Sequence, residues 1–152
     1  MVPLTALGNL GEAVRLAATK TLLVLEDDPA VMMVLRLMLE QYSIIEASSA
    51  EQALRLFTEH GRKIDLLVAD VTLPTSSGIQ VALLLRSEVP DLPVILTTGY
   101  PVSAWNDRDS ADLERLGSRS VTILQKPFQG KALSAAVHEL IGTAPSETAG
   151  TE

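Results

Sequence analysis

Five short apolar runs, separated by segments with helical spacing of apolar residues, constrain the fold of this chain more than any other feature of its sequence. Each run has the length and the aliphatic content of a buried strand. The runs are residues 21–25, 43–47, 65–70, 93–98 and 121–124. Because predicted strands and helices alternate strictly, we expect parallel strands joined by right-handed crossovers, with helices on both faces of one sheet. The sequence therefore predicts an α/β fold with a doubly wound, five-stranded parallel sheet.

The segments between these runs carry apolar residues at the spacing of one-sided helices. The predicted inward stripes are Val31, Val34, Leu35 and Met38; Ala50, Ala53, Leu54 and Phe57; and Leu133, Ala136, Val137 and Leu140. A helix over 78–88 is apolar over most of its surface, as expected for a helix packed tightly on a sheet. The segment 103–117 is so rich in charge that it is the poorest of the predicted helices. A weakly anchored element of this kind is a candidate for movement.

Length and composition indicate one compact domain. The chain has 152 residues, of which 47% are hydrophobic, so it can bury a substantial core. We assign residues 21–142 to this domain, residues 1–20 to a lead-in or linker, and residues 143–152, which are small and polar, to a disordered tail.

Charge and cysteine content exclude several classes of function. A formal net charge of −7 argues against direct nucleic-acid binding, because that affinity comes mainly from Lys and Arg. The chain has no cysteine, which excludes a disulfide framework and a thiolate metal site and fits a reducing compartment. No apolar run approaches the roughly 18 residues of a membrane span, and the first residues lack the pattern of a secretory signal. We therefore expect a cytoplasmic protein with no membrane contact.

Polar residues gather where four of the predicted strands end. They are Glu26, Asp27 and Asp28 after the first strand, Asp70 at the end of the third, Thr98 and Gly99 at the fourth, and Lys126 after the fifth. In doubly wound sheets, ligands bind beyond the carboxyl ends of the strands. We therefore expect these side chains to form one site.

The acids of this group call for different explanations. Asp28 precedes Pro29, and Asp at the N-cap with Pro at the first helical position is a strong signal for a helix start. Glu26 and Asp27 are not explained by capping. Like charges at ~4 Å cost on the order of 4 kcal/mol at an effective dielectric near 20, so a pair of acids facing Asp70 favours bound Mg²⁺. Solvated loop acids are the alternative.

The sequence motifs around the predicted strand ends also resemble those of a known family. The matching pieces, in order, are "VLEDDP" (24–29), "LLVADVTLP" (66–74), "SSGIQV" (76–81), "PVILTTGYP" (93–101) and "LQKPF" (124–128). Each piece is weak alone, but the ordered set resembles the receiver domains of two-component response regulators. This resemblance implies the flavodoxin-like strand order 2-1-3-4-5.

The resemblance also implies a phosphorylation site that uses Mg²⁺. Asp70 would accept a phosphoryl group, Asp27 would bind the metal directly, and Glu26 would bind it through water. Asp70 itself and the main-chain carbonyl of Thr72 would complete the metal ligands. Lys126, which can pair with Asp70, would then pair with a phosphoryl oxygen.

Three further residues at the strand ends take their expected roles from the resemblance. Thr98 would donate its hydroxyl to the phosphoryl group. Gly78 would allow the turn into the third helix, and Gly99 would leave space beside the phosphoryl group. Such a domain would act as a signalling phosphoswitch, not as an enzyme on a separate substrate.

The resemblance further implies a partner and a possible pairing surface. The phosphoryl donor would be the phosphohistidine of a histidine kinase or of a phosphotransfer protein. Homodimers would form through the fourth helix, the fifth strand and the fifth helix. A free-standing regulator and the receiver portion of a hybrid kinase are equally compatible with the chain.

One position departs from the family pattern. The residue three before Lys126, commonly Tyr or Phe in the family, is Ile123 here. An aliphatic side chain cannot present a ring to a partner. We therefore expect Thr98 to signal through backbone shifts of the 99–106 loop, which contains Tyr100 and Trp105. Tyr100 would also shield the acyl phosphate from water.

Two other functions remain open on the sequence. A Mg²⁺-dependent phosphatase with an aspartyl-phosphate intermediate would place its two acids at Glu26 and Asp28, where Glu is the wrong length for the nucleophile. A receiver-shaped interaction module that is never phosphorylated is compatible with Ile123.

Overall fold

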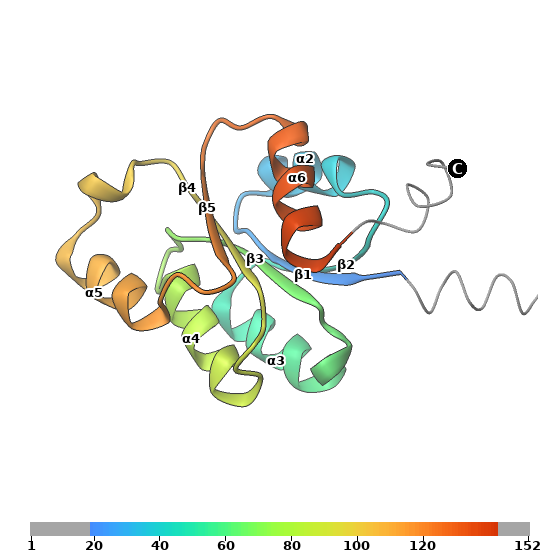
Figure 1. Ribbon diagram of the computed structural model, residues 1–152, viewed down its shortest axis with the longest axis horizontal. Coiled ribbons are helices and arrows are strands. Elements are labelled where there is room, and N and C mark those ends of the chain that lie inside the picture. Colours follow the sequence, from blue (N-terminus) through green and yellow to red (C-terminus); the bar gives the residue numbers. More distant parts are fainter. Residues whose placement is uncertain (1–18, 143–152) are drawn as a thin grey trace, which may run out of the picture.

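The computed structural model describes residues 19–142, which form one α/β layer structure (Figure 1). The strands are β1 (Thr21–Leu25), β2 (Ser43–Ala47), β3 (Leu66–Asp70), β4 (Val94–Thr98) and β5 (Val121–Gln125). All neighbouring strands are parallel, in the order β2-β1-β3-β4-β5. This confirms the predicted doubly wound sheet and its strand order.

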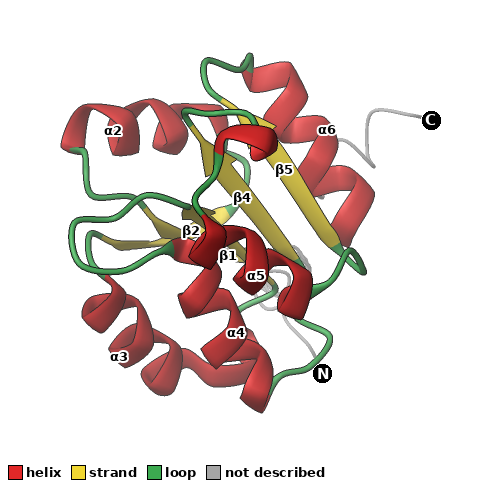
Figure 2. Cartoon of the chain, turned by 90° about the vertical axis from the view of Figure 1, so that its left-hand side faces the viewer, coloured by secondary structure: helices red, strands yellow, loops and turns green. Residues whose placement is uncertain are grey.

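Helices cover both faces of the sheet, as predicted. They are α2 (Pro29–Met38), α3 (Ala50–His60), α4 (Gly78–Glu88), α5 (Asp107–Leu116) and α6 (Gly130–Ile141), with short 3₁₀ turns η1 (Gly61–Lys63) and η2 (Val102–Ala104). Figure 1 shows α2 and α6 on one face and α3, α4 and α5 on the other, and Figure 2 shows the same layers from the side. No helix within residues 19–142 is long and apolar enough to cross a bilayer.

The sheet separates two hydrophobic clusters because successive strand residues point to opposite faces. In β1, Leu23 and Leu25 face the cluster beneath α3, α4 and α5, whereas Leu22 and Val24 face the cluster beneath α2 and α6. All four are essentially inaccessible to solvent. Both faces of the central strands are therefore dry, which explains why the strands read as continuous apolar runs.

Some predicted boundaries and faces were wrong. β3 and β4 begin one residue later than predicted, and β5 ends one residue later. In α2 the buried side chains are Met32 and Leu35, while Val34, placed in the predicted stripe, is 45% exposed. The apolar residues surround this helix too evenly for their spacing to decide which face turns inward.

The charged segment 103–117 forms a shorter helix than predicted. The η2 turn comes first, and α5 then starts after Asn106, whose side chain accepts a hydrogen bond from the Asp109 N–H at 2.7 Å. The predicted lead-in, apart from residues 19 and 20, and the predicted tail lie outside the described residues.

Candidate functional site

Strand register brings the site residues together. Leu25 at the end of β1 is level with Ala69 of β3, so the next residues, Glu26 and Asp70, emerge side by side. On the other side, β4 continues the same edge, and Thr98 is level with Gln125, the residue before Lys126. The structure thus assembles the predicted residues at the carboxyl edge of the sheet.

Three carboxylates form a cluster at this edge. One oxygen from each of Glu26, Asp27 and Asp70 lies within 4.8 Å of the other two. Glu26 and Asp70 are buried, whereas Asp27 is exposed. A set of carboxylate oxygens that is open on one side fits Mg²⁺, a hard cation that keeps several of its waters. These residues are therefore suited to hold the predicted metal.

A cavity of about 270 Å³ opens above the acids. Its walls are Glu26, Asp27, Asp28, Val31, Asp70, Thr72, Gly99, Tyr100 and Lys126. Thr72, predicted to offer its main-chain carbonyl, lies in this wall, and its N–H donates to Asp70 Oδ1 at 3.0 Å. The backbone after β3 therefore fixes one oxygen of the Asp70 carboxylate.

Lys126 bridges the two buried acids. Its Nζ lies 3.0 Å from Asp70 Oδ2 and 3.2 Å from Glu26 Oε1. The contact with Asp70 was predicted, whereas the contact with Glu26 was not. Burial is the largest single influence on the pKa of Lys126 and lowers it, but the hydrogen bonds and charges of Asp70 and Glu26 together outweigh burial and raise the pKa. Lys126 is therefore held as a cation.

Glu26 is the most deeply buried acid of the cluster. Burial raises its pKa above the usual value, and the charge of Asp70 adds to this. A hydrogen bond from the Asp28 N–H, 3.1 Å from Oε2, and the nearby Lys126 act in the opposite direction. Because its two oxygens already have these partners, Glu26 is more constrained than the exposed Asp27.

Asp28 caps α2 as predicted. Its Oδ1 accepts a hydrogen bond from the Ala30 N–H at 2.9 Å, and Pro29 occupies the first turn of the helix. The third acid of the run thus has a local structural role.

The Thr98 hydroxyl is already hydrogen-bonded to the backbone of the loop that follows β4. It donates to the Tyr100 carbonyl at 2.9 Å and accepts from the Tyr100 N–H at 3.1 Å. The side chain is 1% exposed. Ile123 is half-buried and packs against the cluster beneath α3, α4 and α5. Thr98 therefore has to leave the Tyr100 backbone before it can donate to another group.

The chain matches the model of the response regulator receiver domain over residues 22–138. It belongs to the response regulator receiver family. The receiver domain is 33% identical over 132 residues to the sensor kinase CckA of Brucella abortus, and the match covers 86% of this chain and 13% of that protein. It is 37% identical over 112 residues to the response regulator GtcR of Aneurinibacillus migulanus, covering 72% of this chain and 43% of that protein. The chain thus spans less than half of either relative.

Solved structures share the fold. A response regulator receiver domain protein of Clostridium thermocellum aligns with a TM-score of 0.69 at 28% identity, over 80% of this chain and 94% of that one. The response regulator TrrA of Thermotoga maritima, in complex with Mg²⁺ and BeF, aligns with a TM-score of 0.65 at 28% identity, over 80% of this chain and 99% of that one. The receiver domain of the hybrid histidine kinase CckA gives a TM-score of 0.65 at 28% identity, over 80% and 98%.

The structure shows two sets of side-chain contacts that the sequence did not predict, one at the far edge of the sheet and one in the 99–106 loop beside this site. Arg86 in α4 donates to the carbonyls of Leu92, Leu116, Arg119 and Ser120, at 2.8 to 3.3 Å. It ties the loop before β4 to the end of α5. Trp105 donates its indole N–H to the Tyr100 carbonyl at 3.3 Å. Neither contact has a signal in sequence spacing, because both depend on how the helices and loops pack.

Proposed function

We propose that this receiver domain accepts a phosphoryl group on Asp70 from the phosphohistidine of a histidine kinase or phosphotransfer protein. The observation that carries the proposal is the contact of Lys126 with Asp70 inside a cluster of three acids. Oxygen donors for a divalent cation, a nucleophilic carboxylate and a mobile cation thus adjoin one open cavity. The domain would act as a signalling phosphoswitch that catalyses only its own phosphorylation and dephosphorylation.

The transfer is a displacement at phosphorus. A carboxylate oxygen of Asp70 forms the new P–O bond, and the P–N bond to the donor imidazole breaks, with its electron pair leaving on nitrogen. The nucleophile of this reaction is a carboxylate, so no general base is needed. Catalysis of such transfers is mostly positioning and charge stabilisation.

The chain's own residues supply much of that positioning. The Thr72 N–H holds one oxygen of Asp70, and Lys126 can follow the charge from Asp70 to a phosphoryl oxygen. Glu26, Asp27 and Asp70, with the Thr72 carbonyl, would hold Mg²⁺, which when bound supplies the positive charge that offsets the acids and the phosphoryl oxygens. Thr98 would then turn its hydroxyl from Tyr100 to the phosphoryl group.

An apolar groove beside the acceptor cavity suits the docking of the donor. It has a volume of about 350 Å³ and is lined by Ala30, Val31, Val34, Leu35, Met38, Lys126, Pro127 and Phe128. Val31 and Lys126 also line the acceptor cavity, so the two hollows adjoin each other. On α2, Met33, Val34 and Leu37 are 52%, 45% and 66% exposed. We propose that a helix of the phosphodonor lies on α2 and in this groove, with its phosphohistidine over Asp70.

The remaining expectations are part of the same proposal. They are pairing of two copies through α5, β5 and α6, a cytoplasmic location, and a domain that spans residues 21–142. The family match over residues 22–138 supports the last of these.

The deciding experiment is incubation with acetyl phosphate and Mg²⁺, followed by intact mass measurement. We expect the wild type to gain the mass of one phosphoryl group, and Asp70→Asn to gain none. Asp91→Asn, in an exposed carboxylate paired with Arg119, is the matched control and should be phosphorylated like the wild type. Absence of any gain in the wild type would refute the proposal and favour an interaction module that is not phosphorylated.

A further inference from the structure

The carbonyl oxygen of Tyr100 accepts hydrogen bonds from two side chains. Thr98 Oγ1 donates to it at 2.9 Å, and Trp105 Nε1 donates to it at 3.3 Å. A carbonyl oxygen has two lone pairs and can serve both donors at once. Thr98 and Trp105 therefore share one acceptor in the structure.

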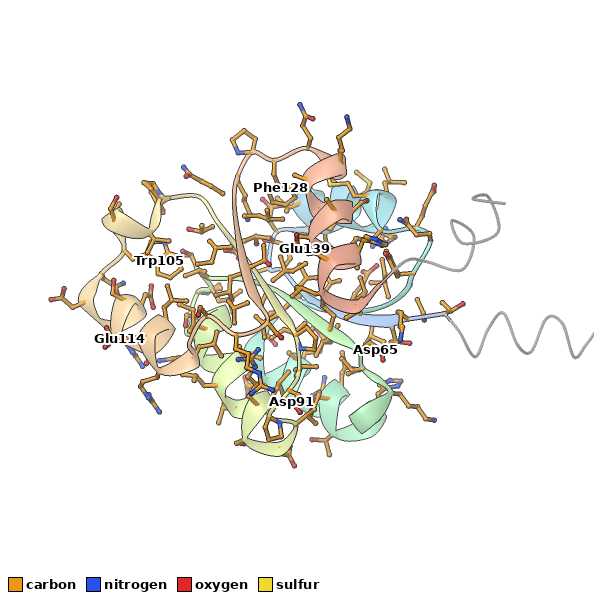
Figure 3. All side chains as sticks on the ribbon, in the orientation of Figure 1. Asp65, Asp91, Trp105, Glu114, Phe128 and Glu139 are labelled. Atoms are coloured by element: carbon orange, nitrogen blue, oxygen red, sulfur yellow. The ribbon has the colours of Figure 1, made fainter. Side chains whose placement is uncertain are left out.

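Trp105 is held in place by the core and by its own loop. Its side chain is half-buried and packs against the cluster beneath α3, α4 and α5. Its backbone N–H donates to the Val102 carbonyl at 3.1 Å, and the next residue, Asn106, caps α5. Figure 3 shows Trp105 between the η2–α5 segment and the body of the domain. The indole thus connects the Tyr100 carbonyl to the start of α5.

The shared acceptor lowers the cost of moving Thr98. When the Thr98 hydroxyl turns to a phosphoryl oxygen, the Tyr100 carbonyl loses one donor. A carbonyl left without any donor is destabilised by more than a hydrogen bond normally contributes, unless water replaces the lost donor. The indole N–H stays on the same oxygen and keeps it paired.

There is also room for the loop to move. A cavity of about 200 Å³ lies beside Thr98 and beneath this loop. Its lining includes Thr98, Tyr100, Ala104 and Trp105. The backbone of the loop can therefore shift once Thr98 has left it.

We infer that Trp105 is a positioning residue for Thr98. By donating to the Tyr100 carbonyl, it releases the Thr98 hydroxyl for the phosphoryl group and passes the change to the start of α5. This inference rests on the proposed function. Ile123 offers no aromatic ring to carry the signal, so we expect the signal to pass through the loop. The hydrogen bonds of Thr98 and Trp105 to the Tyr100 carbonyl give that loop signal a defined path.

A double-mutant cycle tests the inference through the dissociation constant of beryllofluoride with Mg²⁺, measured by ¹⁹F NMR. Trp105→Phe keeps a ring in the core but removes the N–H. We expect it to weaken binding roughly three- to tenfold, the value of one net hydrogen bond. Thr98→Val removes the hydroxyl that Trp105 is inferred to release. In that background, Trp105→Phe should change binding by less than about twofold.

Each result of the cycle is decisive. Unchanged or tighter binding by Trp105→Phe would overturn the inference, and so would an equal loss in the Thr98→Val background, which would indicate a merely structural role. If the wild type itself binds no beryllofluoride, the proposed function is contradicted. That result is distinguishable from a failure of the inference, in which the wild type binds beryllofluoride but Trp105→Phe binds it equally well. Thermal melts of the four proteins check that each one folds.

A second measurement keeps the inference testable if Trp105→Phe does not fold. Trp105 is the one tryptophan of the chain, so fluorescence excited at the red edge, where tyrosine does not absorb, reports this position alone. We expect saturating beryllofluoride to shift the emission of the wild type but not that of Thr98→Val. An unchanged emission in the wild type, or the same shift in both proteins, would overturn the inference.

Discussion

Gly78 lies so close to Asp70 that a Cβ on the glycine would be 2.3 Å from the Asp70 carbonyl oxygen and 2.8 Å from the Ala69 Cβ. The backbone N–H of Gly78 donates to the Val71 carbonyl at 3.2 Å, so the start of α4 is fastened to the chain leaving β3. Gly78 was expected to permit a turn. Its φ is not in the left-handed region, and the structure requires glycine for this close approach instead.

Gly78→Ala should therefore destabilise the domain and disturb Asp70. We expect the free energy of unfolding to fall by about 1–3 kcal/mol, the usual cost of forcing an extra methyl into a packed site. Urea denaturation measures this. Gly99→Ala is the matched control, because a Cβ there meets no atom within 4 Å, so its stability should stay within about 0.5 kcal/mol. Equal stability of the two variants would contradict the packing argument.

Lys126→Met should strengthen Mg²⁺ binding and slow phosphorylation. The ammonium group offsets the charge of Glu26 and Asp70, so its removal leaves the acids to attract the divalent ion more strongly. We expect the Mg²⁺ dissociation constant to fall on the order of tenfold, because the pair is partly screened by solvent. Titration calorimetry measures the affinity, with Lys131→Met, an exposed lysine of α6, as the control. Weaker Mg²⁺ binding in Lys126→Met would show that the lysine does not compete with Mg²⁺ for the acids.

Tyr100→Ala should shorten the lifetime of the acyl phosphate. The Tyr100 side chain is 62% exposed and forms part of the wall of the acceptor cavity, where it can shield the phosphoryl group from water. The decay of phosphorylated protein, followed by intact mass after removal of the donor, gives the lifetime. Val102→Ala, in the same loop but outside that wall, should decay like the wild type. A lifetime in Tyr100→Ala that equals or exceeds the wild-type value would refute the shielding role.

The Arg36–Glu46 pair between α2 and β2 should make part of the stability depend on pH. Arg36 Nη2 lies 2.9 Å from Glu46 Oε1, and this hydrogen bond lowers the pKa of Glu46. A carboxyl whose pKa is lower in the folded state adds stability above its unfolded pKa of about 4.3, and this is lost as the pH falls through the folded value. Glu46→Gln should therefore be less stable than the wild type near neutral pH, with the difference vanishing in acid.

Urea midpoints across a pH series test this last expectation. Glu139→Gln, in an exposed glutamate of α6, is the control for the loss of a negative charge. The difference should also shrink at high salt, because both partners of the pair are accessible to solvent. A difference for Glu46→Gln that persists unchanged in acid would assign the effect to something other than the ion pair.

The sequence by itself determined the features that depend only on residues close together in the chain. Alternating apolar runs and helical spacing were enough for the parallel sheet, because each element buries a face that its own residues define. The cap at Asp28 was also predictable, since the residues that make it are adjacent. The strand ends identified Asp70 and Lys126 as candidates for one site.

Tertiary structure alone decided the contacts between distant segments. Lys126 and Glu26 are 100 residues apart, and their 3.2 Å contact follows from the register of four strands. The inward face of α2 and the approach of Gly78 to Asp70 likewise depend on packing, which a spacing pattern does not encode. The Tyr100 carbonyl shared by Thr98 and Trp105 depends on the path of a loop. Periodicity gives the direction of side chains within an element, whereas distances between elements are set by how all of them pack together.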